Sequence, residues 1–207
     1  MLFASPEARG MKVIVAGAQS DVGCELLIDA APGAKPSGRT THSRGTVVLG
    51  SSGLPAIMPI GQPTFGWIPF AYPDAESIWH GPSLRAFRNL SFLDAAGWAE
   101  LIAPAKSELS GTRPSEGWRL AVSLMDGCLV ACGTYTYFMM NQRLEIPQGI
   151  ERLQVGREPR AGERCLMHFD VLRQDARDTW FDFVVVGEDY APLFVATSYR
   201  TVLLRGA

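Results

Sequence analysis

Residues 119–149, RLAVSLMDGCLVACGTYTYFMMNQRLEIPQG, decide the fold. The segment from Cys128 to Met140 is long, apolar and free of proline, and a polar exit follows at residues 141–143. Several of its side chains recur at helical spacing on one face: Leu129, Cys132, Tyr135, Thr136 and Met139. This spacing predicts one largely buried helix, around which the rest of the chain is arranged.

A single carboxylate, Asp126, stands just ahead of this apolar segment and is followed by Gly127. We expect Asp126 at or just before the first helical turn. There a carboxylate accepts hydrogen bonds from free backbone N–H groups and is favoured by the helix dipole. On composition alone, Asp126 is therefore an N-cap.

The composition is that of an ordinary globular protein. The chain has 207 residues, 47% hydrophobic and 19% charged, which suits one large domain or two small ones. A net charge of −2 gives no electrostatic reason to expect binding to nucleic acid or to an anionic membrane. No apolar run reaches membrane-spanning length and no signal peptide is recognisable, so we expect a cytoplasmic protein.

The cysteines and histidines do not form a metal-binding pattern. Cys128 and Cys132 are four residues apart, which suits neighbours on one helix face and predicts buried free thiols. His42, His80 and His168 belong to no zinc or other metal motif. We therefore expect no metal site.

The first part of the chain contains three short β-rich runs, at residues 11–16, 24–30 and 44–50, with turn residues at 21–23. Without a helix to cover them, these strands need a partner surface. A segment rich in proline and aromatic residues follows at 51–73. We place the domain boundary near residue 75, which divides the chain into residues 1–75 and 76–207.

After this boundary a turn at residues 78–84 leads into a β-like segment that ends at Leu93, and residues 95–102 read as strand plus loop. Four further strands are predicted after the central helix, at residues 150–155, 164–172, 180–186 and 193–204. Strands, one long apolar helix and then an antiparallel meander make up the α+β arrangement called a hot dog.

Three motifs resemble a known family. They are His80-Gly81-Pro82, the segment LMDGCL at residues 124–129, and PQGIERL at residues 147–153. Together and in this order they resemble the dehydratase domain of polyketide synthases and related multifunctional fatty-acid synthases, in which two hot dogs are fused. The resemblance covers residues 76–207 as the second hot dog. Residues 11–50 look like closing strands of a first hot dog, with residues 41–45 similar to its final strand.

This resemblance implies removal of water from a 3-hydroxyacyl thioester carried on the phosphopantetheine of an acyl carrier protein, with no further cofactor. In the family, the first hot dog supplies a histidine base and the second an aspartic acid. Asp126 corresponds to the acid, and His80 would hydrogen-bond it across the site. The positions implied for substrate binding are Gly81, Pro82, Val130 and Tyr135.

The sequence departs from the family pattern at two places. Family members that act as dehydratases commonly carry Gln or His four residues after the aspartate, whereas this chain has Val130, which forms no hydrogen bond. The family's HxxxGxxxxP motif is missing, since His42 is followed by Gly45 after three residues instead of four. The resemblance therefore implies that the chain begins inside the first hot dog, and that the base comes from a preceding segment or a partner chain.

Several functions remain open at this stage. The first is a dehydratase, or its C-terminal half, with Asp126 as acid. The second is a non-catalytic hot dog that binds acyl chains or docks within a synthase. A product-template-like or isomerase-like relative and a hot-dog thioesterase are the others, the last by fold analogy alone. Aromatic residues at positions 65–72 either line an acyl tunnel or pack the linker onto the sheet.

A single hot dog leaves a sheet edge and a helix face uncovered. We therefore expect a homodimer or contacts with other synthase domains, in addition to the acyl carrier protein.

Overall fold

A computed structural model describes residues 11–18, 21–28, 40–48, 54, 60–63, 65–72, 80–112, 114–140 and 144–204. The chain divides into two compact units, residues 1–53 and residues 54–207.

The first unit holds an antiparallel three-stranded sheet in the order β1-β2-β3, with β1 at Met11–Ala18, β2 at Asp21–Ile28 and β3 at Thr40–Val48. The prediction of three strands is confirmed. Residues 21–23, expected as a turn, belong to β2 instead, because Asp21 pairs directly with Ala18 and the ladder continues from there. The turn chemistry of Asp21 and Gly23 is overridden by strand pairing on both sides of β2.

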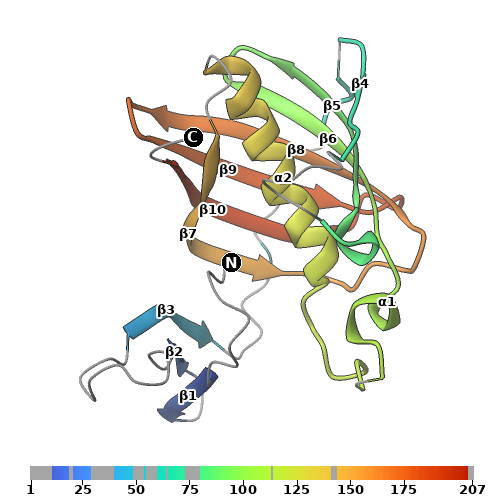
Figure 1. The fold of residues 1–207 in the computed structure, drawn as a ribbon. Helices are drawn as coiled ribbons and strands as arrows, with labels where there is room; N and C mark the ends of the chain where they lie inside the picture. The colour runs from blue at the N-terminus through green and yellow to red at the C-terminus, as the bar shows by residue number, and fades with distance from the viewer. Residues whose placement is uncertain are drawn as a thin grey trace. The chain divides into compact units, whose positions relative to one another are not determined.

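The second unit is a seven-stranded antiparallel sheet with one long helix, α2, at Val122–Met139 (Figure 1). Its strand order is β4-β5-β6-β8-β9-β10-β7. The strands are β4 (Ile68–Pro69), β5 (Phe87–Leu93), β6 (Ala96–Ile102), β7 (Glu145–Val155), β8 (Arg164–Gln174), β9 (Asp178–Val186) and β10 (Pro192–Leu203). Two short helical segments complete the unit, η1 (Pro82–Leu84) and α1 (Lys106–Ser110).

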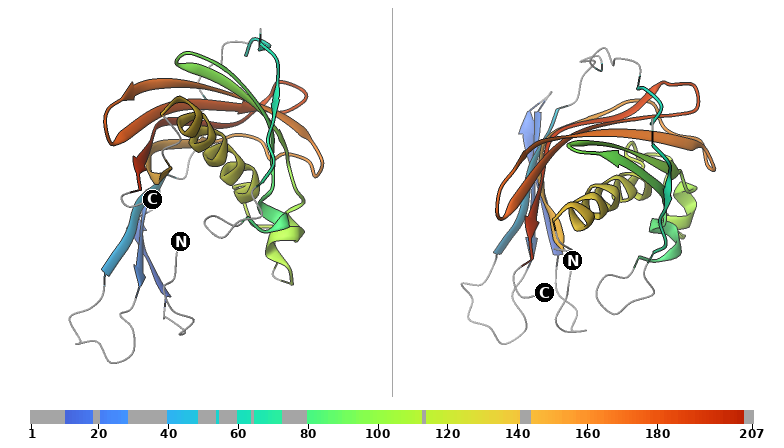
Figure 2. Two further views of the ribbon diagram at one scale, coloured as in Figure 1. Left: turned by 45° about the horizontal axis from the view of Figure 1, so that its top comes forward. Right: turned by 90° about the horizontal axis from the view of Figure 1, so that it is seen from above.

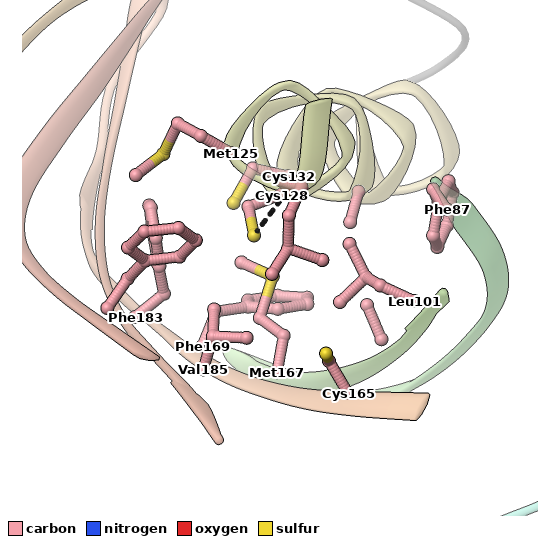
Figure 3. Close-up of a cluster of buried hydrophobic side chains, with 14 of the residues drawn as sticks. Phe87, Leu101, Met125, Cys128, Cys132, Cys165, Met167, Phe169, Phe183 and Val185 are labelled. Atoms are coloured by element: carbon pink, nitrogen blue, oxygen red, sulfur yellow. Dashed lines mark hydrogen bonds between the residues drawn. The ribbon is translucent and has the colours of Figure 1, made fainter. Parts of the chain in front are cut away.

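The sheet curves around α2, as the two views of Figure 2 show, and this is the hot-dog arrangement expected from the order of elements. Figure 3 shows the thiols of Cys128 and Cys132 pointing from α2 into the core formed with Met167 and Phe169 of β8. Both cysteines are free and buried, as their spacing predicts. The side chain of Met139 is 46% exposed, so the last turn of the predicted buried face is not covered.

α2 begins six residues earlier than the apolar segment from which it was predicted. Its N-cap is Ala121, which has no capping side chain, and Asp126 lies in the second turn. The N-cap interpretation of Asp126 is therefore wrong. The reason is tertiary packing, because Leu124 and Met125 are buried in the core and extend the helix backward over the sheet.

The proline-rich segment belongs to the second unit. Ile68 and Pro69 pair with β5, and Trp98 of β6 donates its indole N–H to the carbonyl of Gly61 at 2.8 Å. The Phe70 ring lies 4.5 Å from the ring of Phe87. Contacts therefore divide the chain between residues 53 and 54, whereas the sequence places the boundary near residue 75. Packing of aromatic side chains against the core accounts for this difference.

A bulge in β10 changes which side chains face the core. Ala196 is buried, and the alternation then shifts so that Tyr199 and Thr201 are buried as well. Ser198 adopts a left-handed conformation with φ of 55°, and its N–H donates to Oδ1 of Asp182 at 2.8 Å. Such a bulge inserts one extra residue and reverses the inward and outward positions beyond it.

One buried carboxylate joins the loop after β7 to the loop after β9. Glu163 accepts hydrogen bonds from the guanidinium of Arg157 at 3.0 and 2.5 Å and from the backbone N–H groups of Arg160 and Glu188. The hydrogen bonds from Arg157 lower the pKa of Glu163 from 4.5 to about 2, and those from the backbone act in the same direction. Gly187 packs directly on this pair, since an added Cβ would lie 1.9 Å from Nη2 of Arg157.

Substitution Glu163→Gln should lower the free energy of unfolding by roughly 2 kcal/mol at pH 7, because Arg157 loses its charged partner. Since the pKa of Glu163 is lower in the folded state, its stabilisation is present above about pH 4.5 and is lost as the pH falls toward 2. Urea unfolding at several pH values measures this difference. Glu151→Gln, at an exposed position of β7, is the control. An equal loss at pH 7 and at pH 2.5 would contradict the interpretation.

Gly127 allows α2 to approach the start of the sheet. A Cβ at this position would lie 2.9 Å from Cδ2 of Leu101, 3.0 Å from Cβ of Ala86 and 3.2 Å from the backbone nitrogen of Phe87. At Gly133, in the same helix, the nearest atom would be 3.9 Å away, the carbonyl oxygen of Glu145. Only the first glycine is therefore required by close packing.

The variant Gly127→Ala should be destabilised by about 1 kcal/mol, because overpacking outweighs the gain in helix propensity. Gly133→Ala should be stabilised by about 0.5–1 kcal/mol, since nothing opposes that gain. Thermal or urea unfolding of the two variants provides the comparison. If both stabilise the protein equally, the close approach at Gly127 is not a constraint.

Candidate functional site

Asp126 is the only charged residue among the 18 residues of α2. Its side chain is 31% exposed, yet its Oδ2 atom is buried and accepts no hydrogen bond from the described residues. Leu124 and Cys128, two residues away on either side, are fully buried against the sheet. With a period of 3.6 residues, Asp126 therefore lies on the side of α2 that turns away from the sheet.

His80 approaches Asp126 from the segment that enters η1. Its Nε2 atom lies 3.4 Å from Oδ2 of Asp126, and the imidazole is 15% exposed. Gly81 is the N-cap of η1 in an extended conformation, and Pro82 occupies the first helical position. This local turn brings His80 over the second turn of α2. The structure thus brings together the two residues that the resemblance singles out as acid and partner.

Burial raises the pKa of Asp126 above its ordinary value of 3.8, and the nearby His80 acts in the opposite direction. Desolvation disfavours a carboxylate, whereas a neighbouring cation or hydrogen-bond donor favours it. Since the desolvation effect is larger, the carboxyl group retains a proton to higher pH than an exposed aspartate. A carboxyl group of this kind is suited to general acid catalysis.

Tyr72 is a third member of the site that the motifs did not reveal. Its ring lies 5.4 Å from the ring of His80, and its hydroxyl accepts a hydrogen bond from the backbone N–H of Phe87 at 3.0 Å. Burial raises the pKa of Tyr72 to about 12, with the charge of Asp126 contributing in the same direction. Its place among the aromatic residues at 65–72 was the only signal in the sequence.

The other predicted substrate-binding residues do not all lie beside Asp126. Gly81 and Pro82 shape the turn that carries His80.

The other two predicted residues belong to α2. Val130 is one helical turn after Asp126 and packs, partly buried, against the core. Tyr135 is 3% exposed, and its hydroxyl donates to the carbonyl of Asp94. Tyr135 lies nine residues after Asp126 in the helix, which corresponds to a distance of about 13 Å along the helix axis. A concavity at the start of α2 is lined by neither Asp126 nor His80.

Among the described residues, no group of His, Cys, Asp or Glu side chains comes together as a metal site would require. His168 packs its ring 4.9 Å from Trp98 and lies 3.7 Å from Asp170, on the sheet and not in this site. No helix in the described part of the chain is long and apolar enough to cross a membrane.

No family model and no curated protein matches the chain. Solved structures do match. The dehydratase domain of a mycocerosic acid synthase-like polyketide synthase shares 13% identity and a TM-score of 0.66 over 94% of this chain and 69% of its own. A dehydratase domain of a trans-acyltransferase polyketide synthase from Brevibacillus brevis shares 17% identity and a TM-score of 0.65. That match covers 89% of this chain and 66% of the other.

The bifunctional dehydratase-cyclase domain of ambruticin biosynthesis matches with 17% identity and a TM-score of 0.62, over 94% of this chain and 68% of that one. The chain has the hot-dog fold of polyketide synthase dehydratase domains. The match extends over nearly all of the chain, and the chain spans about two thirds of the length of these domains.

Substitution Asp126→Asn should stabilise the protein at pH 7 by about 1 kcal/mol, because a partly desolvated charge is removed. The folded-state pKa of Asp126 is raised, so the penalty for ionisation is present above that pKa and disappears as the pH falls toward 3.8. Urea unfolding at pH 7 and pH 3.5 compares the two proteins. A variant that is less stable than the parent at pH 7 would contradict the desolvation of Asp126.

Proposed function

We propose that the chain is the catalytic C-terminal hot dog of a dehydratase that acts on a carrier-bound 3-hydroxyacyl thioester, with Asp126 as the acid. The observation that supports this most strongly is the pair formed by Asp126 and His80, because it places one carboxyl group of raised pKa on an otherwise uncharged helix. Such an arrangement costs stability and is typical of sites selected for chemistry.

In the proposed reaction, a base removes the α-proton of the thioester and the electrons of that C–H bond form the new double bond. The C–O bond at the β-carbon breaks, and the carboxyl group of Asp126 gives its proton to the departing hydroxyl, which leaves as water. The apolar surroundings of Asp126 keep the carboxyl group protonated before this step. His80 then stabilises the carboxylate that results, because it lies 3.4 Å from Oδ2.

We assign the base to a segment or partner outside the described residues. His80 serves Asp126, His168 lies elsewhere on the sheet, and His42 in β3 does not fit the HxxxGxxxxP motif. An acyl carrier protein would deliver the substrate on its phosphopantetheine arm, and no other cofactor is needed for loss of water. A second copy of the chain or other synthase domains would complete the assembly. The acyl carrier protein, the second copy and the other synthase domains are thus proposed partners.

A non-catalytic acyl-binding or docking module is the second candidate function. Val130 favours it, because a side chain without hydrogen-bonding groups occupies the position where the family's dehydratases commonly carry Gln or His. In this case Asp126 would lack one of its hydrogen-bond donors, and His80 alone would contact it. The two candidates differ in turnover and not in fold.

Incubation with 3-hydroxyacyl pantetheine thioesters, or with the same acyl groups on a carrier protein, tests the proposal by mass spectrometry of the 2-enoyl product. When a first hot dog that carries the base is supplied, we expect turnover, and a loss of about 10²- to 10⁴-fold in Asp126→Asn because the proton donor is removed. Asp170→Asn, at an exposed position of β8, is the matched control and should keep full activity.

Equal turnover in the Asp126→Asn variant and the parent would remove Asp126 from the chemistry. Absence of product from a folded chain, including mixtures with a separately supplied first hot dog, would favour the binding module. The assay therefore decides between the two functions.

A further inference from the structure

The hydroxyl of Tyr72 is anchored at the junction of η1 and β5. It accepts the backbone N–H of Phe87 at 3.0 Å and lies 3.4 Å from the carbonyl oxygen of Leu84, to which it donates. Its ring and the ring of Phe70 meet edge to face, with centroids 4.9 Å apart. A tyrosine held by its hydroxyl and by one ring neighbour has a fixed ring orientation. The ring of Tyr72 also lies beside the ring of His80.

His80 is contacted on several sides by this cluster. The Tyr72 ring lies 5.4 Å from the imidazole, with the two planes inclined at 57°. Nε of Arg85 donates to the backbone carbonyl of His80 at 2.9 Å, and the guanidinium carbon of Arg85 lies 5.8 Å from the centroid of the Tyr72 ring. Arg85 thus fixes the backbone of His80, while Tyr72 supports its side chain. Asp126 is a further neighbour of the imidazole, among the described residues.

We propose that Tyr72, supported by Arg85, is a positioning residue that holds the imidazole of His80 against the carboxyl group of Asp126. The separation of 3.4 Å between Nε2 and Oδ2 is at the limit of a hydrogen bond, so a small rotation of the imidazole breaks the contact. Rotation about χ1 and χ2 is open to a histidine without neighbours, and the Tyr72 ring blocks it on one side. In this role Tyr72 acts through His80 and not on the reacting atoms.

A neutral phenol suits this position. Burial raises the pKa of Tyr72 to about 12, so the hydroxyl keeps its proton at neutral pH. It can therefore donate to Leu84 while accepting from Phe87. A phenolate would place a second negative charge near Asp126, where it would oppose formation of the carboxylate during the reaction.

Two-bond nitrogen–proton spectra of the histidine-labelled protein test this positioning without any substrate. In the parent, Asp126→Asn should shift the Nε2 resonance of His80, because the two groups are in contact. In the Tyr72→Leu background the same change at Asp126 should leave that resonance unmoved. Tyr72→Phe keeps the ring, and should keep the response. An undiminished response in Tyr72→Leu would overturn the proposal.

Arg85→Lys is the second variant, to be used where Tyr72→Leu does not fold. It retains the positive charge but removes the Nε–H donor to the His80 carbonyl, so the response of His80 to Asp126→Asn should also weaken. A response equal to that of the parent would argue against the contribution of Arg85.

The effect on turnover rests on the proposed dehydratase function and is measured separately. Tyr72→Leu should lower kcat by about 10- to 100-fold with little change in KM, since misplaced catalytic groups affect the reaction step. In a His80→Asn background, Tyr72→Leu should cause no further loss, because Tyr72 acts through His80. If the losses of kcat in the two variants add up in the double variant, Tyr72 does not act through His80. Absence of turnover in every protein would refute the proposed function alone, and the spectra would still decide the positioning role.

Discussion

The desolvation of one carboxyl group on an apolar helix is the constraint on which the site depends. α2 is buried along one side against a curved sheet, and Asp126 interrupts its uncharged sequence on the other side. Partial burial without a full set of hydrogen-bond donors costs free energy, and the contact with His80 offsets only part of that cost. The fold must therefore supply the remaining stability, through the core beneath α2 and through the ion pair of Glu163 with Arg157.

The pair is assembled from segments that are distant in the sequence. His80 comes from the turn into η1, Tyr72 from the proline-rich segment, and Asp126 from the second turn of α2. Gly127 lets α2 approach Phe87 and Ala86 closely enough for these segments to meet. A helix that stood farther from the start of β5 would separate the carboxyl group from the imidazole. Close packing beside Asp126 and the contact of Asp126 with His80 are thus consequences of the same short stretch of helix.

Much of the fold follows from sequence patterns, and the exceptions have physical causes. The apolar spacing after Cys128 predicts α2, and short β-rich runs predict most of the strands, because each pattern repeats over a whole element. The start of α2 and the bulge at Ser198 were not predicted, since the first depends on packing of Leu124 and Met125 and the second on a hydrogen bond to Asp182. Asp126 and His80 emerged from motifs. Tyr72 did not, because its role depends on contacts made only in the folded chain.

The most direct test of this account is the carboxyl titration of Asp126, followed by carbon NMR in the aspartate-labelled protein and assigned with the Asp126→Asn variant. The account predicts a pKa above the ordinary value of 3.8, and a further rise when His80 is replaced by Asn, because the opposing effect of the imidazole is lost. A pKa at or below 3.8 in the parent, or no response to His80→Asn, would contradict the claim that burial and His80 together set the chemistry of this site.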